Sequence, residues 1–253
     1  MIPAISVIAA FPELVEHACS LGVTHRARER NLWQFRGFSL RDFATDARKT
    51  IDGRPAGGGP GMVLMQGPLD SATAAAREWH TATELRGNDA GKTKIILLSP
   101  DGDRLDQAMA QRLSAEPNIT LVAGRYEGLD QRWIEKSVEQ TISIGDYVLS
   151  GGEIAAAVLI DAIVRLLPGA LGDSESAITE SFSAGLLDWP QYALTNAAGN
   201  ADIPPVLLGG NHALINRWRR EQALARTLVR RPDLLANANL DKADKAFLDK
   251  IKL

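Results

Sequence analysis

Apolar runs alternate with helical patterns along the first two thirds of the chain. The expected strands and helices are residues 5–10 and then 12–20, residues 94–98 and then 104–113, residues 119–123, and residues 141–149 and then 153–167. Short apolar runs of this kind are typical of strands that are buried on both faces. Because these strands are separated by helices, the pattern predicts an α/β domain with a mainly parallel sheet.

One expected helix, at residues 153–167, is apolar on nearly every side and ends at Pro168 and Gly169. A helix without a polar face is not stable in water along its whole length. It must therefore be buried, and the pattern leaves open whether it is buried in a core or against a partner subunit.

The regular pattern stops after Gly169. Residues 170–186 are rich in small and polar side chains without periodicity, which is typical of a flexible linker or a lid. Two further helices are expected, at residues 212–231, ended by Pro232, and at residues 241–252. The pattern therefore predicts a second, smaller, helical domain.

The long helix at residues 212–231 combines an apolar stripe with arginines. The expected buried stripe consists of Leu214, Ile215, Trp218, Ala225, Leu228 and Val229. Arg219, Arg226 and Arg230 are spaced by seven and four positions, so we expect them on one exposed face. Such a face could bind the phosphates of a folded RNA, but it is equally typical of a helix face that is only exposed to water.

The composition is that of a folded protein, since 45% of the 253 residues are hydrophobic. The formal net charge of −3 argues against nucleic-acid binding over the whole surface. Such binding depends on local basic surface, however, and residues 211–231 hold six arginines against one acid, Glu221. An RNA partner at this helix is therefore compatible with the acidic total.

Cys19 is the only cysteine, which excludes an internal disulfide and a thiolate zinc site. No stretch approaches the roughly 20 apolar residues that span a bilayer, and the N-terminus has no basic flank before a long apolar core. We therefore expect a cytoplasmic protein that is neither exported nor bound to a membrane.

The most informative stretch is SIGDYVLSGG at residues 143–152, which leads directly into the apolar helix. Paired glycines before a helix leave backbone amides bare beside its N-terminus, an arrangement that suits a polar ligand. GGGPG at residues 57–61 lacks the Lys-Ser/Thr of a phosphate-binding P-loop. No early strand leads into the G-x-G-x-x-G turn of a Rossmann site or a common seven-stranded methyltransferase site.

Four motifs together resemble one family. They are SIGDYVLSGG, GRYEG at residues 124–128, LLSP at residues 97–100 and RPAGGGPG at residues 54–61. The chain resembles the bacterial tRNA (guanosine-37 N1) methyltransferases of the trefoil-knot SPOUT superfamily. The resemblance covers nearly the whole chain, from FPEL near Phe11 to VLLGGNH and RRPDLL in the C-terminal region.

The resemblance implies a fold, a reaction and partners. The fold is α/β, with a trefoil-knotted, mainly parallel sheet at residues 1–170 that binds S-adenosyl-L-methionine. A flexible linker at residues 171–188 carries the catalytic acid, and a smaller all-α domain at residues 189–253 binds tRNA. The reaction is methyl transfer to N1 of guanosine 37, performed by a homodimer whose active site is shared between subunits. A requirement for Mg²⁺ is also implied, but no metal-ligand spacing is evident in the sequence.

The cofactor site implied by the resemblance consists of three loops. The first is Leu97, Leu98, Ser99 and Pro100; the second is Gly124, Tyr126, Glu127 and Gly128; the third is Ser143, Ile144, Gly145, Tyr147, Leu149, Gly151 and Gly152. Most contacts are expected to come from the backbone. Backbone contacts do not depend on the side chain, so the site should tolerate Leu97, where close relatives often carry tyrosine, and Ala155, where many carry proline. Arg125 and Glu127 could also pair with each other.

Arg165 and Glu180 are the catalytic pair that the resemblance implies. In the family an arginine at the end of the apolar helix works with an aspartate fifteen positions later, and Glu180 stands at that spacing here. Guanine N1 carries a proton, so a carboxylate must remove it, while an arginine stabilises charge on O6. The sequence reads ITESF where relatives read EDSF, so the acid is one methylene longer. Asp173 and Glu175 are the lesser candidates for the base.

Candidate RNA contacts are Asp52 and Arg54, which resemble positions near the target guanosine, and Arg219, Arg226 and Arg230. Two other functions stay open. One is a non-catalytic RNA-binding relative, because Glu180 stands in place of the family's aspartate and YTRP is absent after Trp189 and Pro190. A knotted methyltransferase that acts on another RNA would carry the same arginines.

Overall fold

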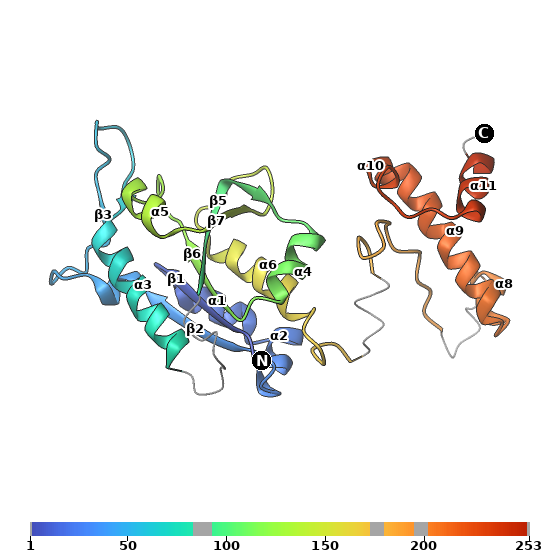
Figure 1. Cartoon of the computed structure of the whole chain (residues 1–253), viewed down its shortest axis with the longest axis horizontal. Helices are drawn as coiled ribbons and strands as arrows, with labels where there is room; N and C mark the ends of the chain where they lie inside the picture. The colour runs from blue at the N-terminus through green and yellow to red at the C-terminus, as the bar shows by residue number, and fades with distance from the viewer. Residues whose placement is uncertain (1, 83–92, 173–179, 195–201, 252–253) are drawn as a thin grey trace. The chain divides into compact units, whose positions relative to one another are not determined.

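The computed structural model describes residues 2–82, 93–172, 180–194 and 202–251 (Figure 1). The chain folds as two compact units, residues 1–172 and residues 173–253. Each unit has its own hydrophobic core, and each is described here by itself.

The described part of the first unit contains a five-stranded parallel sheet. Its strands are β1 (Ala4–Ala9), β2 (Gln34–Ser39), β5 (Lys94–Arg104), β6 (Asn118–Ala123) and β7 (Gln140–Ser143). They are arranged in the order β2-β1-β6-β5-β7, and every neighbouring pair is parallel. The α/β fold predicted from the apolar runs is confirmed. The trefoil knot stays a prediction.

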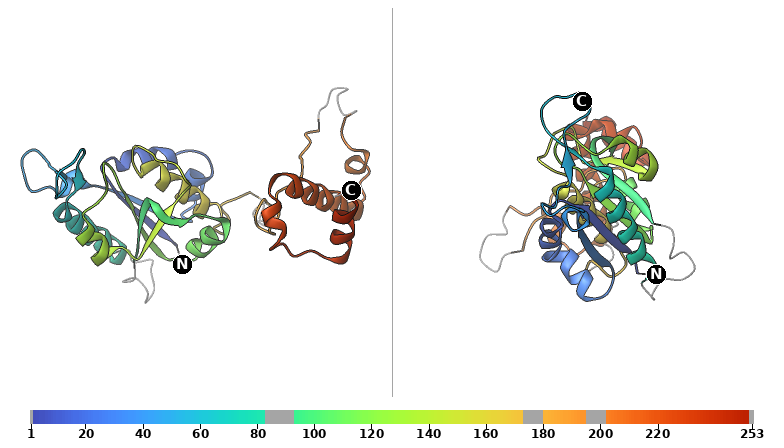
Figure 2. Two further views of the ribbon diagram at one scale, coloured as in Figure 1. Left: turned by 90° about the horizontal axis from the view of Figure 1, so that it is seen from above. Right: turned by 90° about the vertical axis from the view of Figure 1, so that its left-hand side faces the viewer.

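Helices cover both faces of this sheet (Figures 1 and 2). One face carries α1 (Pro12–Cys19), α2 (Gly22–Glu29), α4 (Gln107–Ser114) and α6 (Glu153–Val164). The other carries η1 (Leu40–Phe43), α3 (Gln66–Thr81) and α5 (Gln131–Ser137). Alternate strand residues enter different cores, since Val7 lies in the first and Ile8 in the second. This is the two-residue period of a strand buried on both sides.

A small antiparallel hairpin projects from the first unit. It pairs β3 (Asp52–Gly53) with β4 (Val63–Leu64), and its loop contains the GGGPG motif. The backbone N–H of Leu64 donates to the carbonyl of Gly128 (2.9 Å), and the N–H of Glu127 donates to the carbonyl of Met62 (2.9 Å). These bonds hold the hairpin against the loop that follows β6.

Two element boundaries differ from the expectation. The strand expected at residues 141–149 ends at Ser143, because Gly145 has a φ of 148° and the chain turns into a loop. The helix expected at residues 104–113 begins at Gln107, because β5 continues to Arg104 beyond a bulge at residues 99–102. Asp106 then caps the helix by accepting a hydrogen bond from the N–H of Met109 (2.7 Å).

The apolar helix α6 is buried on its sheet-facing side, where Leu159, Ile160 and Val164 are inaccessible to water. On its other side Ile154 is 50% exposed and Val158 44% exposed. The predicted burial is therefore complete on one side of the helix only. No helix in the described ranges is both long enough and apolar enough to cross a bilayer.

The regular elements of the second unit, within its described residues, are all helices. It contains α8 (Pro205–Leu208), α9 (His212–Arg230), α10 (Pro232–Leu235) and α11 (Lys242–Ile251). The C-terminal helices confirm the predicted helical region. The side chain of Asn211 caps α9, and Pro232 follows its end.

The buried face of α9 overlaps the expected stripe only at Ile215, which is buried as predicted. The residues buried on it are Ile215, Ala223, Leu224 and Thr227. Leu214 and Val229, both expected inside, are 58% and 81% exposed. The reason is that α10, α11 and Leu186 pack against α9 and select the face around Leu224.

Candidate functional site

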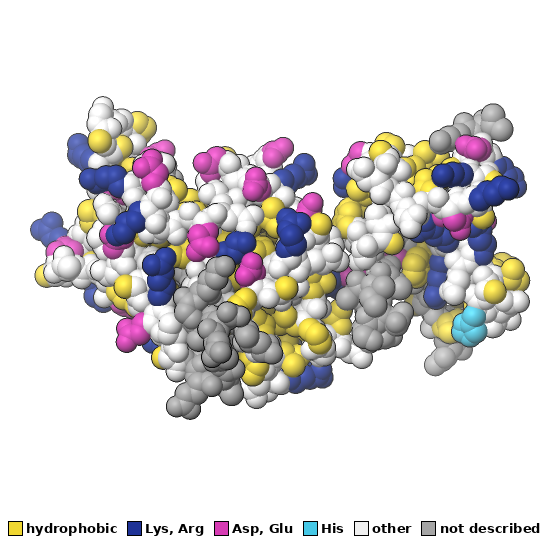
Figure 3. Space-filling view, viewed as in Figure 1, with side chains coloured by type: hydrophobic (Ala, Val, Ile, Leu, Met, Phe, Trp, Pro, Cys, Tyr) yellow, Lys and Arg dark blue, Asp and Glu magenta, His cyan; other side chains and the backbone are white. Residues whose placement is uncertain are grey.

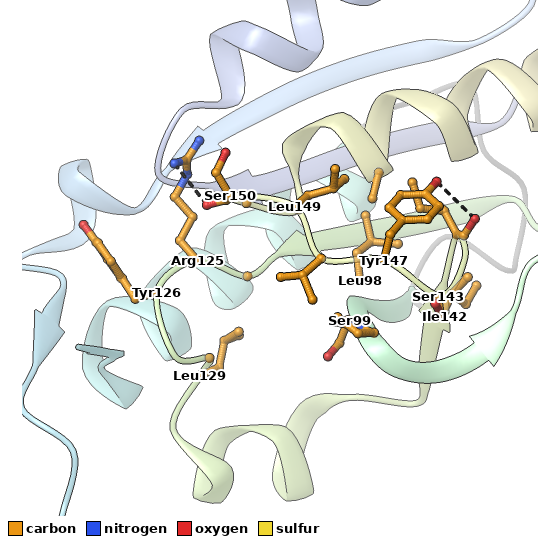
Figure 4. Close-up of a pocket in the computed structure, with 18 of the residues that line it drawn as sticks. Leu98, Ser99, Arg125, Tyr126, Leu129, Ile142, Ser143, Tyr147, Leu149 and Ser150 are labelled. Carbon is orange, nitrogen blue, oxygen red and sulfur yellow. Dashed lines mark hydrogen bonds between the residues drawn. The ribbon is translucent and has the colours of Figure 1, made fainter. Parts of the chain in front are cut away.

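A pocket lies at one edge of the sheet, beside the bulge in β5 and the carboxyl ends of β6 and β7 (Figure 4). Its volume of about 260 Å³ is close to the lower end of the roughly 300–1,000 Å³ that is usual for cofactor sites. The lining residues are Leu98, Ser99, Pro100, Gly124, Arg125, Tyr126, Glu127, Gly128, Leu129, Ile142, Ser143, Ile144, Gly145, Tyr147, Val148, Leu149, Ser150, Gly151, Gly152 and Ala155. Ligands of open α/β sheets bind outside the carboxyl ends of the strands, so this position suits a ligand site.

The pocket brings the three sequence-predicted loops together. Every residue named for them lines it except Leu97. Leu97 and Leu98 point to opposite faces of β5, so Leu97 is buried in the second core, with α3, and Leu98 faces the pocket. Leu129 and Val148 also line the pocket, although they were not among the predicted cofactor contacts. No sequence signal separates them from other loop residues.

Gly152 forms the closest backbone contact in the pocket wall. Its N–H donates to the carbonyl of Gly124 (2.8 Å). A Cβ at Gly152 would lie 2.9 Å from the Cα of Ala123 and 3.0 Å from the N of Gly124. No side chain fits this space, because the start of α6 lies directly against the end of β6. The glycine therefore keeps the second and third loops in contact.

Arg125 connects the same two loops through its side chain. Its Nε donates to Oε1 of Glu153 (2.8 Å), and its guanidinium lies 4.6 Å from the centre of the Phe11 ring. Glu153 is 1% exposed, and its Oε2 has no hydrogen-bond partner within the described ranges. The partner of Arg125 is thus Glu153 and not Glu127. Removing Arg125 would leave the buried Glu153 carboxylate uncompensated, at a cost of about 3–5 kcal/mol.

The third loop is held by hydrogen bonds of its own. The hydroxyl of Ser143 lies 3.2 Å from both the N–H and the carbonyl oxygen of Gly145. The hydroxyl of Tyr147 donates to the carbonyl of Ile144 (3.3 Å; Figure 4). Tyr147 and Val148 remain 55% and 84% exposed. The loop therefore has a defined backbone and presents large apolar side chains at the mouth of the pocket.

The hairpin residues lie next to this pocket. Asp52 is half-buried in β3, and Arg54 is exposed just beyond it. Gly61 packs so closely against Glu127, a lining residue, that a Cβ at Gly61 would overlap the glutamate side chain. The predicted guanosine-contacting residues are therefore carried by a hairpin that is anchored to the second loop.

Arg165 and Glu180 belong to different units. Arg165 is the residue that caps the C-terminal end of α6 in the first unit, and it is half-buried. Glu180, also half-buried, is the first described residue of the second unit. Its carbonyl accepts a hydrogen bond from the N–H of Ser183 (3.2 Å). Asp173 and Glu175, the other candidates for the base, lie outside the described residues.

The arginines of α9 do not share one exposed face. Arg219 lies 5.1 Å from the centre of the Trp189 ring, and Nη1 of Arg226 donates to the carbonyl of Asp188 (3.1 Å). Both are half-buried, because the segment that precedes α8 packs over them, and the expectation of exposure was wrong for these two. Arg230 is exposed as expected. Lys and Arg side chains nevertheless gather over α9 and α11 (Figure 3).

Two further arginines of α9 have a structural role. Nη2 of Arg220 donates to Asp244 (2.8 Å), and Arg217 lies 3.4 Å from the same carboxylate. Burial acts to raise the pKa of Asp244, but the hydrogen bonds from Arg220 and Asp241 outweigh burial and hold that pKa below its usual range. These arginines join α9 to α11.

The described residues contain no group of three or more His, Cys, Asp or Glu side chains that could hold a metal ion. The Mg²⁺ implied by the resemblance stays a prediction.

Comparison with known proteins gives one consistent result. The family model described as "tRNA (Guanine-1)-methyltransferase TrmD" matches residues 4–237. Among curated relatives, the tRNA (guanine-N(1)-)-methyltransferase of Methylococcus capsulatus is 46% identical over 97% of this chain and 94% of its own length. Proteins with the same name from Halorhodospira halophila and Aromatoleum aromaticum are 47% and 48% identical, over 97% of this chain and 89% and 92% of their own lengths.

Proposed function

The chain belongs to the tRNA (guanine-1)-methyltransferase family, and we propose that it transfers a methyl group from S-adenosyl-L-methionine to N1 of guanosine 37 in tRNA. The observation that carries the proposal is the meeting of the three predicted loops in one pocket at the carboxyl edge of the sheet. The cofactor supplies a methyl group bonded to a positively charged sulfur. The pocket lies in the part of the chain that the family model covers.

The cofactor is held mainly by backbone groups of the three loops. Gly151 leaves a backbone amide beside the start of α6, where the helix dipole favours electron-rich ligand atoms. Leu98 and Leu149, from the first and third loops, supply apolar surface for the adenine ring. The Arg125–Glu153 ion pair holds the second loop against the start of α6, which follows the third loop. Small residues in the loops suit this mode of binding, because side chains would block the backbone.

Glu180 is the general base, and Arg165 is the electrostatic partner. The N1–H proton of guanine passes to the Glu180 carboxylate as N1 forms its bond to the methyl carbon and the sulfur–methyl bond breaks. The Arg165 guanidinium stabilises negative charge that develops on O6.

The functional domains are residues 1–170 for the cofactor, residues 171–188 for the linker with the base, and residues 189–253 for tRNA binding. The division of the chain after residue 172 supports this organisation. Asp52 and Arg54 contact the target guanosine from the hairpin beside the pocket, and Arg219, Arg226 and Arg230 contact tRNA from α9. A cytoplasmic location follows from the tRNA substrate.

The test of this function is a methylation assay with labelled S-adenosyl-L-methionine and total tRNA, followed by mapping of the modified nucleoside. We expect label on N1 of guanosine 37. Label on a different RNA position would support a methyltransferase of other specificity. Binding of the cofactor without any turnover would instead support a non-catalytic RNA-binding relative.

The active site is shared between two subunits of a homodimer. Ile154, Val158 and Arg165 lie at positions i, i+4 and i+11 of α6, so the exposed apolar residues and the catalytic arginine share one side of the helix. A partner that covers this apolar side brings its own chain close to Arg165. The site of one subunit then receives Glu180 from the other.

Complementation between two inactive variants measures this sharing. An equal mixture of Gly152→Val, which disrupts the wall of the cofactor pocket, and Glu180→Gln, which lacks the base, should regain roughly a quarter of the wild-type activity. The reason is that about half of the dimers are mixed, and each mixed dimer has one complete site. Each variant alone is the control. No recovery in the mixture, or a monomer in sedimentation at micromolar concentration, would contradict the shared site.

A further inference from the structure

The second unit contains a cavity that the proposed reaction does not use. Its volume is about 170 Å³, and its walls are formed by residues 189–194, α8 and the first half of α9. This volume is well below the roughly 300–1,000 Å³ of sites for whole cofactors or drug-sized ligands. The cavity therefore suits a single ring system and not a nucleotide cofactor.

Aromatic side chains form much of the cavity wall. Tyr192 and Trp218 both line it, with ring centres 6.2 Å apart and planes inclined at 54°. Tyr192 is 44% exposed, and Leu208 on α8 is 50% exposed at the rim. Large apolar side chains at a concave and accessible surface favour a flat apolar ligand.

Two hydrogen-bond donors of the same cavity lack acceptors. The Nε1–H of Trp189 and the Nε–H of Arg219 are both buried, and neither has a hydrogen-bond partner within the described ranges. The Arg219 guanidinium also stacks over the Trp189 ring at 5.1 Å. Unpaired buried donors are rare in folded proteins, because desolvation without a replacement bond is unfavourable. A ligand that presents acceptor atoms would satisfy both donors.

The ligand class follows from these two features together. A nucleobase has a flat apolar face for the aromatic wall and carbonyl or ring-nitrogen acceptors along its edge. A phosphate would pair with the donors but leave the rings unused, and an apolar peptide segment would leave the donors unpaired. Lys and Arg side chains gather over α9 and α11 of the same unit (Figure 3), which favours a polyanion as the carrier of the base.

We propose that this cavity is a stacking site for one unpaired nucleobase of the tRNA substrate, bounded by Trp189, Tyr192 and Trp218, with Arg219 as a hydrogen-bond donor. The identity of the substrate rests on the proposed function. The site lies in the second unit, so it recognises the RNA outside the methylated position and adds to affinity without taking part in the chemistry.

The experiment compares tRNA affinity of the full-length protein and its variants over a series of salt concentrations. Tyr192→Ala should bind tRNA roughly 5-fold to 100-fold more weakly, and Tyr192→Phe, which keeps the ring, should bind within about twofold of wild type. Stacking releases no counterions, so the salt slope of Tyr192→Ala should equal that of wild type. Arg230→Ala, on the exposed end of α9, should instead reduce the slope by about one.

Leu214→Ala is the matched control on the same helix, since Leu214 is 58% exposed and does not line the cavity. It should leave tRNA affinity unchanged, and circular dichroism should be the same for all variants. Wild-type affinity of Tyr192→Ala would overturn the proposal, as would an equal loss for Tyr192→Phe. A failure of the proposed function would look different: the wild-type protein would not methylate tRNA, whatever the result for Tyr192.

Discussion

Glu180→Gln is expected to reduce the single-turnover rate of tRNA methylation by about 100-fold to 10,000-fold, while affinity for S-adenosyl-L-methionine stays unchanged. The substitution keeps the shape of the side chain but removes the group that accepts the N1 proton. Arg165→Ala should have a similar effect, because charge on O6 develops mainly in the transition state. Single-turnover assays with saturating enzyme isolate the methyl-transfer step from product release.

Glu180→Asp is the matched control for this prediction. It shortens the side chain by one methylene, restores the acid that relatives carry, and should stay within about tenfold of the wild-type rate. A misplacement of about 1 Å costs up to roughly 100-fold in a rigid site, so a smaller change would indicate that the segment around Glu180 adjusts. If Glu180→Gln methylates tRNA at the wild-type rate, the base lies elsewhere, and Asp173 and Glu175 become the next residues to replace.

Gly152→Val is expected to weaken binding of S-adenosyl-L-methionine by at least about 100-fold, which calorimetry would record as a loss of detectable binding. A Cβ at this position would lie 2.9 Å from the Cα of Ala123, and backbone atoms cannot move aside as a flexible side chain can. The start of α6 must therefore shift away from β6, which separates the second loop from the third and opens the pocket.

Gly67→Val is the matched control for Gly152→Val. Gly67 is exposed near the start of α3, and a Cβ there would meet no atom within 4 Å. This variant should bind the cofactor as wild type does, and both variants should keep the wild-type circular dichroism. Wild-type affinity in Gly152→Val would contradict the assignment of the pocket to the cofactor.

Four of the five strands of the sheet could be predicted as apolar runs. The strand β2 (Gln34–Ser39) was not predicted, because only Phe35 and Phe38 are buried in it. Residues 4–9 and 118–123 are apolar along nearly their whole length, which a half-exposed strand would not be. The loop at residues 144–149 was expected to continue its strand because Ile144, Val148 and Leu149 are apolar as well. Their apolar character suits the mouth of a pocket, and hydrophobicity alone does not distinguish a lining residue from a core residue.

The loops of the candidate site were recognisable for a different reason. Their motifs resemble those of a known family, and the backbone requires two of their glycines: Gly145 has a φ of 148°, and Gly152 lies against the backbone of Ala123 and Gly124. The arginines of α9 carry no such signal. Arg217 and Arg220 bind Asp244, Arg219 stacks on Trp189, and only the packing of neighbouring segments separates these roles from that of the exposed Arg230.

By itself the sequence determined the α/β unit with its mainly parallel sheet and the helical region after it, because these depend on local periodicity. The three loops of the pocket were predicted from the resemblance of their motifs to those of a known family. Only the tertiary structure decided the partner of Arg125, the buried face of α9 and the aromatic cavity beside it. The partners in those contacts are 28 or more residues apart, as for Arg125 and Glu153, or lie on separate elements. Their pairing depends on how whole elements pack, which no local pattern encodes.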